Sequence, residues 1–391
     1  VSLEASVNGH PPMRFALDTG APTSVLSSVA AKELAFDTPN KVGGDDITGT
    51  RGVYPYGVAE VVRVGTIEFS KMPFIVAEGL FDSFEPMGIS GILGYPGFDE
   101  FTLDIDYPGG VIRLSQRPLL PTDPGVTELQ REGEGAISVP VELLDAAEKV
   151  AGSSWFKVDT GGEFMLHLPS SMASWVEQDL GKNLRVGTGL SGQTSAHKTA
   201  PVAGSIRIGS TIIDRGIAEF ETPKRLIGHQ LLRQFRVRLD PISGLALFTP
   251  PNPHAERIRA LQYKGIGVNL SLLNNGELVL LSIRANSPAA RAGLLPNDRV
   301  MAIDGIRVGE DGFVDRTAWF FDPAEAVTLS IRRNDEHFEV TVPLEDVFPA
   351  NLDELRDAPA DIQPPPIKLI RNPDGSYRID TSWGADGKEM P

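Results

Sequence analysis

The sequence contains one seven-residue pattern twice, and this internal repeat constrains the fold more than any other feature. Residues 15–21 read Phe-Ala-Leu-Asp-Thr-Gly-Ala, and residues 156–162 read Phe-Lys-Val-Asp-Thr-Gly-Gly. Three further landmarks recur in the same order: Val62–Gly65 with Ile206–Gly209, Ile92-Leu93-Gly94 with Leu226-Ile227-Gly228, and Leu103–Leu114 with Val237–Phe248. Landmarks that keep one order and nearly one spacing indicate two copies of a lobe of roughly 115 residues.

The residues between these landmarks favour short strands over long helices. The chain has 40 glycines and 31 prolines, more than the usual share, and only 7% aromatic residues. Residues 1–7 alternate as a strand does, and Asn8-Gly9 is typical of a type I′ hairpin turn. Short helices are expected at 27–34 and 170–180, each beginning at a serine that can cap the first turn. We therefore expect the lobes to be all-β.

Charge and composition argue against several classes of function. The formal net charge is −16, which disfavours binding to nucleic acid or to anionic lipid. Cysteine is absent, so there is no thiolate nucleophile and no zinc ribbon. No apolar run approaches the length of a membrane span, and the six histidines are scattered without ligand spacing. We expect no metal, no cofactor and no integral membrane segment in this chain.

The same patterns predict the domain organisation. The two lobes are expected at 1–117 and 136–250, joined by a linker at 118–135 that contains prolines and alternating charges. A second linker at 251–262 leads to a third unit at 263–344. Beyond it, 345–391 is expected to be a polar, Pro-rich tail in an extended or mobile form.

Two Asp-Thr-Gly turns, one in each copy of a lobe, point to a pair of carboxyl groups related by a pseudo-two-fold axis. Two carboxylates held close together cannot both ionise, so they share a proton. One can then accept a proton from water while the other donates to a carbonyl oxygen, which is acid–base hydrolysis of an amide. The threonine hydroxyl can bond to the backbone of the opposite turn, and the glycine permits a sharp bend.

These motifs resemble the retropepsin-like aspartic proteases, within the wider pepsin and retroviral protease group. That family has an Asp-Thr-Gly-Ala or Asp-Thr-Gly-Ser turn, a hairpin flap, and an apolar-apolar-Gly segment that packs under the turn. The matching residues are Asp18, Thr19, Gly20 and Ala21 in the first copy, and Asp159, Thr160 and Gly161 in the second, where Gly162 replaces the usual Ala or Ser. The resemblance covers about residues 1–250 and implies a bilobed protease whose catalytic residues are Asp18 and Asp159. It places the flaps at 47–57, with Tyr54 or Tyr56 able to close over substrate, and at 186–199.

Residues 263–344 resemble a PDZ domain, an α+β fold, of the type found in bacterial proteases. The resemblance depends on Gly265, Ile266, Gly267 and Val268, and on the segments 287–294 and 298–305. It implies that the 265–268 loop offers N–H groups to the C-terminal carboxylate of a peptide, while the next strand pairs with that peptide. The alternative is a PDZ fold that only packs against the protease, with the Trp-Phe-Phe run at 319–321 filling the groove.

Taken together, the resemblances imply an aspartic endopeptidase with a PDZ domain for substrate or partner recognition or for regulation. The expected partners are protein or peptide substrates, and a peptide C-terminus or extended strand at the PDZ groove. Proteins of this architecture are expected in the periplasm, the cell envelope or the secreted fraction of a bacterium. Two alternatives remain: a non-catalytic peptide-binding scaffold that acts through its PDZ domain, and an obligate homodimer in which each lobe pairs with its counterpart in another chain.

Overall fold

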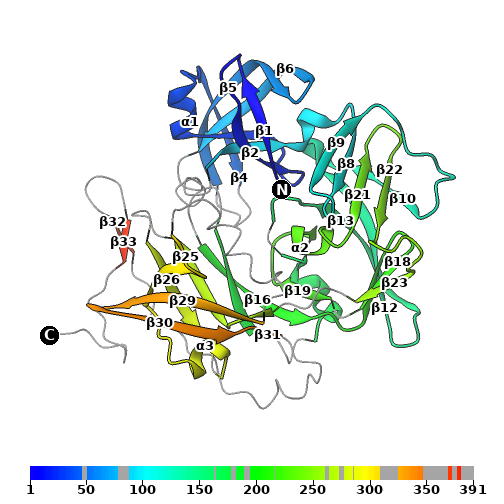
Figure 1. Cartoon of the computed structure of the whole chain (residues 1–391). Helices are drawn as coiled ribbons and strands as arrows, with labels where there is room; N and C mark the ends of the chain where they lie inside the picture. The colour runs from blue at the N-terminus through cyan, green and yellow to red at the C-terminus, as the bar shows by residue number, and fades with distance from the viewer. Residues whose placement is uncertain are drawn as a thin grey trace. The chain divides into compact units, whose positions relative to one another are not determined.

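β-Strands dominate the chain in the computed structural model, as the sequence predicts (Figure 1). The structure describes residues 1–45, 51–77, 88–162, 164–177, 182–188, 194–214, 216–259, 264–272, 277–284, 286–308, 325–346, 369–371 and 377–379. The chain folds into two compact units, Val1–Leu261 and Gln262–Pro391. The first unit holds both copies of the repeat.

The first copy of the repeat is built on a sheet with the strand order β1-β2-β7-β3-β6-β5-β4. Its strands are β1 (Ser2–Val7), β2 (Met13–Asp18), β3 (Ser24–Ser27), β4 (Asn40–Asp45), β5 (Arg51–Val64), β6 (Ile67–Ala77) and β7 (Ile89–Gly94). Helix α1 (Ser28–Glu33) follows β3, and a 3₁₀ turn (Tyr95–Phe98) follows β7. Strand β2 therefore lies beside β7, which carries the first apolar-apolar-Gly segment.

The first hairpin has the turn that the sequence predicts. Asn8 and Gly9 have positive φ angles of 49° and 80°, as a type I′ turn requires. The N–H of His10 donates to the carbonyl of Val7 at 3.0 Å and closes the turn. Pairing between β1 and β2 begins only at Met13, because the two prolines before it have no N–H to donate.

The two predicted helices have different outcomes. Ser27 caps α1 as expected, since its hydroxyl accepts from the N–H of Ala30 at 3.0 Å. The second prediction, a helix at 170–180, is wrong over 170–176: Ser170–Trp175 forms a kinked 3₁₀ segment in which Met172 has non-helical dihedral angles, and 178–180 lie outside the described residues. No side chain caps its first turn, and Val176 returns to extended backbone.

The second copy is built on a sheet with the order β15-β16-β19-β14-β20-β13-β12-β17-β18-β23, with β11 beside β12. Its strands are β11 (Gln130–Arg131), β12 (Ile137–Leu144), β13 (Val150–Val158), β14 (Leu166–Leu168), β15 (Lys182–Thr188), β16 (Thr194–Pro201), β17 (Ser205–Ile208), β18 (Thr211–Asp214), β19 (Ile217–Phe220), β20 (Leu226–Ile227) and β23 (Arg257–Arg259). Short helical segments lie at Gly133–Gly135 and at α2 (His229–Leu232). Strand β13 runs parallel to β20, as β2 does to β7.

A third sheet joins the two copies. Its order is β10-β22-β21-β8-β9, formed by β8 (Thr102–Asp106), β9 (Val111–Ser115), β10 (Val126–Glu128), β21 (Arg236–Asp240) and β22 (Leu245–Thr249). The last pair of repeat landmarks therefore meets here, with Leu239 opposite Leu103 (Figure 1). Arg236 donates to the buried Asp104 across the same pair of strands at 2.8 Å.

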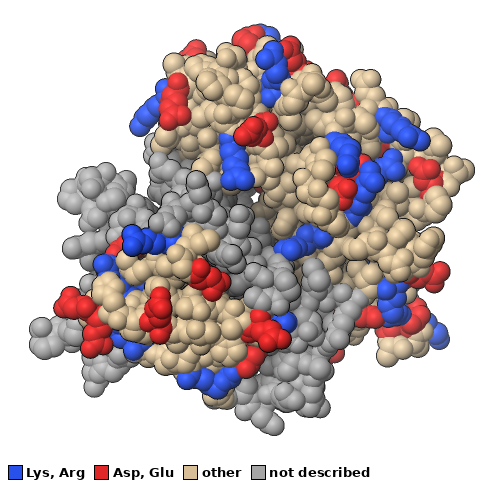
Figure 2. Space-filling model, viewed as in Figure 1, with Lys and Arg blue, Asp and Glu red and all other residues tan. Residues whose placement is uncertain are grey.

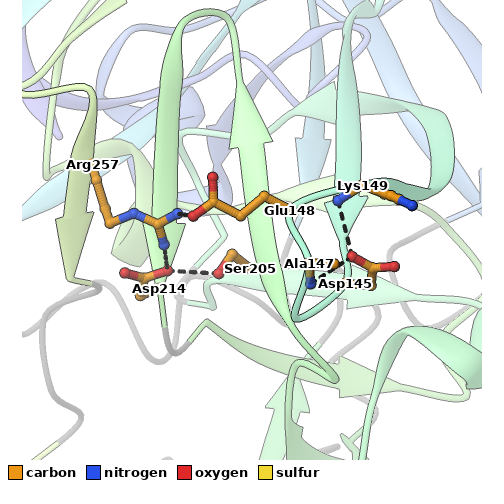
Figure 3. Close-up of polar contacts among 7 residues, drawn as sticks. All are labelled: Asp145, Ala147, Glu148, Lys149, Ser205, Asp214 and Arg257. Atoms are coloured by element: carbon orange, nitrogen blue, oxygen red, sulfur yellow. Dashed lines mark hydrogen bonds and ion pairs between the residues drawn. The ribbon is translucent and has the colours of Figure 1, made fainter.

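Strand β23 ties the chain that leaves the second copy back to its sheet (Figure 3). Arg257 forms ion pairs with Asp214 on β18 and with Glu148 in the β12–β13 turn. Burial opposes ionisation of Asp214, but hydrogen bonds from Arg257 and Ser205 lower its pKa below the usual value. In the same turn, Asp145 accepts from two backbone N–H groups at 2.8 and 2.9 Å.

The second unit has a core of its own, formed by β25–β30 and α3. Its strands are β24 (Lys264–Gly265), β25 (Val268–Leu272), β26 (Leu278–Ile283), β27 (Arg299–Ile303), β28 (Ile306–Arg307), β29 (Ala326–Arg333), β30 (Glu336–Pro343) and β31 (Glu345–Asp346), with α3 at Pro288–Arg291. Of the predicted tail, β32 (Leu369–Arg371) and β33 (Tyr377–Ile379) pair antiparallel. Its other residues beyond 346, like the Trp-Phe-Phe run at 319–321, lie outside the described residues.

The sheet that joins the two copies should make them unfold together. Leu239 is fully buried in it, so Leu239→Ala should lower the free energy of unfolding by about 2–5 kcal/mol. Amide hydrogen exchange should also speed up in β8, although β8 belongs to the other copy. The control is Ile242→Ala, at a side chain that is 65% exposed, which should change neither quantity. Unchanged exchange in β8 would contradict the prediction.

Candidate active site

The two Asp-Thr-Gly turns follow equivalent strands of the two copies. Asp18 is the last residue of β2 and lies opposite Gly94 of β7. Asp159 directly follows β13, and its N–H donates to the carbonyl of Ile227 on β20 at 2.9 Å. Each turn is therefore fixed against the apolar-apolar-Gly segment of its own copy, as the resemblance implies.

Threonine side chains join the two turns by reciprocal hydrogen bonds. The Thr19 hydroxyl donates to the carbonyl of Val158 at 2.7 Å, and the Thr160 hydroxyl donates to that of Leu17 at 2.7 Å. Each hydroxyl also accepts from the backbone N–H of the other threonine, at 3.0 and 3.1 Å. Both threonines are buried. The predicted cross-link between the turns thus forms within one chain.

The first glycine of each turn brings the two aspartates together. A Cβ atom on Gly20 would lie 2.5 Å from Cγ of Asp159, and one on Gly161 would lie 2.5 Å from Cγ of Asp18. Real Cβ atoms do not approach a carboxyl group so closely, so only glycine fits at either position. Each carboxyl group therefore packs against the backbone of the opposite turn.

Backbone N–H groups hold each carboxylate in place. Gly20 donates to Oδ1 of Asp18 at 2.7 Å, and the N–H of Ala21 bonds to the carbonyl of Asp18 at 3.3 Å. In the second turn Gly161 and Gly162 donate to Oδ1 of Asp159 at 3.0 and 2.8 Å. Backbone N–H groups therefore orient the Oδ1 atoms of both aspartates.

The structure explains why Gly162 replaces the usual Ala or Ser. A Cβ atom there would lie 2.2 Å from the ring of Phe164, which is buried beneath the turn. The carbonyl of Gly162 accepts from the N–H of His229, at the start of α2, at 2.7 Å. The substitution therefore makes room for an aromatic ring and does not free the turn.

Asp159 is 6% exposed, and its environment favours the protonated acid. Burial raises the pKa of Asp159 well above its ordinary value, and the charge of Asp18 and a hydrogen bond between the two carboxyl groups raise it further. Lys157 and the N–H of Gly162 oppose this rise. The pair therefore holds a proton at pH values where a solvent-exposed aspartate would be ionised, and it titrates as a unit.

Sequence reasoning missed Lys157 as a member of the site. Lys157 stands on β13 two residues before Asp159, and it is half-buried. Burial lowers the pKa of its ammonium group, with a smaller effect of Lys224, while both aspartates act in the opposite direction. A charged residue in the apolar run that leads into the turn was the available signal, since the first copy has Ala16 at this place.

The flap candidates are only partly described. Strands β4 and β5 form the predicted hairpin of the first copy, and its tip, 46–50, lies outside the described residues. Tyr54 and Tyr56 pack against an apolar cluster that includes Val25 and Ile92. In the second copy β15 and β16 pair as a hairpin, and residues 189–193 at its tip lie outside the described part.

In the second unit, the predicted peptide-binding loop connects β24 to β25. Gly265 pairs with Glu345, and Ile266 is buried, with its carbonyl accepting from the N–H of Ala289 at 2.9 Å. Gly267 has a φ of +78° and passes close to Ser287, so a side chain there would collide. Val268 begins β25, where it pairs with Ile283. Residues 319–321, which could fill the groove, lie outside the described residues.

The described residues contain neither a metal-binding cluster nor a membrane-spanning helix. No group of three or more His, Asp or Glu side chains comes together there as metal ligands would. No helix in the described part of the chain is long and apolar enough to cross a membrane. Among the described residues, the polar groups of the two turns include the paired carboxyls, the threonine hydroxyls and backbone N–H groups, and Lys157 lies two residues before Asp159.

Comparison with known proteins gives two family matches. Residues 3–96 match the aspartyl protease family, and residues 265–344 match the PDZ domain family. Among solved structures, a retropepsin-like aspartic protease from Rickettsia conorii is 23% identical, with a TM-score of 0.23, over 29% of this chain and 80% of that one. A photosystem II D1 C-terminal processing protease is 17% identical, with a TM-score of 0.19, over 22% of this chain and 23% of that one. No curated protein sequence matches the chain. The chain is thus mainly β, with an aspartyl protease domain followed by a PDZ domain.

Removing one threonine hydroxyl should weaken both turns. Thr160→Val leaves the carbonyl of Leu17 and the N–H of Thr19 without their partner, at about 1–3 kcal/mol for each buried group. Chemical denaturation should therefore show a clear loss of stability. Thr160→Ser keeps the hydroxyl and should recover most of it. Equal stability of the valine and serine variants would show that the cross-link contributes nothing.

The raised pKa of Asp159 should appear as a pH dependence of stability. The folded chain holds this proton above pH 3.8, where an ordinary aspartate has lost it, so the free energy of unfolding falls as pH rises through the raised pKa. Asp159→Asn stays uncharged and should lose this fall, which amounts to about 1.4 kcal/mol for each unit of pKa shift. Urea denaturation from about pH 4 to about pH 8 measures both proteins.

Asp335→Asn is the matched control, because that residue is exposed in the β29–β30 hairpin of the other unit. It should follow the wild-type dependence on pH. Parallel curves for the wild type and Asp159→Asn would mean that Asp159 is ionised like any surface aspartate.

Proposed function

We propose that this protein is an aspartic endopeptidase that activates water between Asp18 and Asp159. The observation that carries the proposal is the cross-linked pair of turns, in which each first glycine packs against the opposite carboxyl group. The family match of residues 3–96 supports the same chemistry for the first copy of the repeat. The raised pKa of Asp159 also supports the proposal, because such a pair must hold one proton and Asp159 is the carboxyl group that keeps it.

In the proposed reaction the two carboxyl groups have different roles. Asp18, as carboxylate, takes a proton from water while the water oxygen bonds to the carbonyl carbon of the peptide. Asp159, as acid, gives its proton to the carbonyl oxygen, which forms a tetrahedral diol. The C–N bond then breaks as the amine takes the proton from Asp18, and a hydroxyl proton returns to Asp159. No covalent bond to the protein forms at any step.

The PDZ domain is proposed to recognise a substrate or a partner protein. The resemblance to PDZ domains implies that the loop formed by Gly265, Ile266, Gly267 and Val268 binds a peptide C-terminus beside the first strand of the sheet. The buried Ile266 and the positive φ of Gly267 give this loop a fixed shape. A second binding site on one chain raises the local concentration of substrate at the protease.

Replacing either aspartate should abolish peptide cleavage. With a mixed peptide library scored by mass spectrometry, Asp18→Asn and Asp159→Asn should each lower the rate by about 10²–10⁴-fold, because each removes one partner of the acid–base pair. Thermal denaturation should show that both variants remain folded. Asp335→Asn should cleave as the wild type does.

The outcomes separate the proposal from its alternative. Cleavage that survives one substitution would mean that the two lobes are not equal partners in catalysis. A folded wild type that binds peptides and cleaves none would instead support a scaffold acting through the PDZ domain.

A further inference from the structure

A cationic pocket lies on the second copy of the repeat, beside the strand that leads to Asp159. Its volume is about 320 Å³. Lys157, Lys224 and Arg225 line it together with Trp155 and one carboxylate, that of Glu132. Three cationic side chains against one acidic side chain give the pocket a local charge opposite to that of the chain as a whole.

The pocket is connected to the aspartate pair through two adjacent strands. Lys157 and Asp159 are two residues apart in extended backbone, so their side chains leave the same face. Strand β20 lies beside β13, with Leu226 opposite Lys157, and the N–H of Lys157 donates to the carbonyl of Arg225 at 3.1 Å. The ammonium group of Lys157 interacts electrostatically with both Asp18 and Asp159. The pocket therefore shares a strand with Asp159, although neither aspartate is among the residues that line it.

The first copy has no such pocket lining. The register that places Leu226 opposite Lys157 places Ile92 opposite Ala16. Before Ile92 the chain reads Ser90-Gly91, where the second copy has Lys224-Arg225. The strands of the two copies therefore pair alike. Lys157, Lys224 and Arg225 of the second copy are charged, and Ala16, Ser90 and Gly91 at the same places in the first copy are not.

The cations of the pocket differ from many others in the same unit. Arg63, Arg207 and Arg236 each form an ion pair with a carboxylate, and Figure 2 shows both signs of charge interspersed on the face in view. Within the described residues, Lys157 and Lys224 have no carboxylate within ion-pair distance, and Arg225 donates to the hydroxyl of Ser154 at 2.8 Å. Asp18, Asp159 and Glu132 act on Lys157 electrostatically without forming an ion pair with it, so all three cations can still bond to an anion in the pocket.

We propose that this pocket receives an aspartate or glutamate side chain of the substrate, close to the bond that is cleaved. This inference rests on the proposed function. Lys157 and Lys224 face the incoming carboxylate, and Trp155 packs against its aliphatic part. The first copy has Ala16, Ser90 and Gly91 at the places of Lys157, Lys224 and Arg225, and Arg14 at the place of Trp155. Because three cations therefore stand on one side against one on the other, the acidic side chain also favours one of the two directions in which a peptide can lie across a pseudo-symmetric pair of lobes.

The test compares charge selectivity in Lys224→Glu with that of the wild type. Lys224 is exposed, so the change should leave folding intact. In a mixed peptide library at about pH 6, where glutamate is ionised, the wild type should prefer an acidic residue over its amide at one position near the cleaved bond by about tenfold or more. Lys224→Glu should remove this preference. Lys32→Glu makes the same charge change on α1, outside the pocket, and should keep it.

Peptide binding to a catalytically inactive variant tests the pocket without any cleavage. Two labelled peptide pools, identical except for a central Glu or Gln, are titrated against Asp18→Asn and against Asp18→Asn with Lys224→Glu. The Glu pool should bind about tenfold more tightly than its twin to the first protein and no more tightly to the second. Equal binding of the twins to Asp18→Asn, or cleavage by the wild type without an acidic preference, would overturn the inference. A Glu preference in binding without cleavage by the wild type would overturn the proposed function alone.

Discussion

The reciprocal hydrogen bonds between Thr19 and Thr160 are the interaction on which the rest of the candidate site depends. They are buried, and each hydroxyl both donates to and accepts from the opposite turn. Because the turns are fixed at this distance, each first glycine meets the opposite carboxyl group. The shared proton follows from that approach, since burial and mutual repulsion favour one acid and one carboxylate. The contact between the two turns therefore accounts both for the position of the aspartates and for the raised pKa of Asp159.

The repeated motifs made the fold class and the position of Asp18 and Asp159 predictable, because a duplicated turn between strands implies a two-fold arrangement. They also predicted the cross-link by threonine. The ring of Phe164 under Gly162 could not be foreseen, since that contact depends on how distant segments pack. The same holds for the pairing of β8 with β21: the sequence shows that the two segments are alike, and nothing in it shows that they lie side by side. The predicted second helix is a kinked 3₁₀ segment over Ser170–Trp175, and the sequence gives no sign of the non-helical dihedral angles at Met172 that interrupt it.

The two copies keep the same backbone plan while their side chains have diverged. Strands β2 and β13 pair with their neighbours in the same register, yet one carries Ala16 and the other Lys157. A strand position that faces a site tolerates such a change because the ladder uses only backbone groups. A single-chain protein can therefore differentiate the two sides of its site, whereas two identical chains could not.

The sheet formed by β10, β22, β21, β8 and β9 has a further consequence for how such a protein behaves in the cell. The linker strand β10 lies at its edge, and β21 of the second copy pairs with β8 of the first, so the copies are joined by a hydrogen-bonded ladder as well as by the peptide chain. Bringing the two aspartates together is then a folding event and not an encounter between molecules. Pairing of the turns within one chain does not depend on protein concentration.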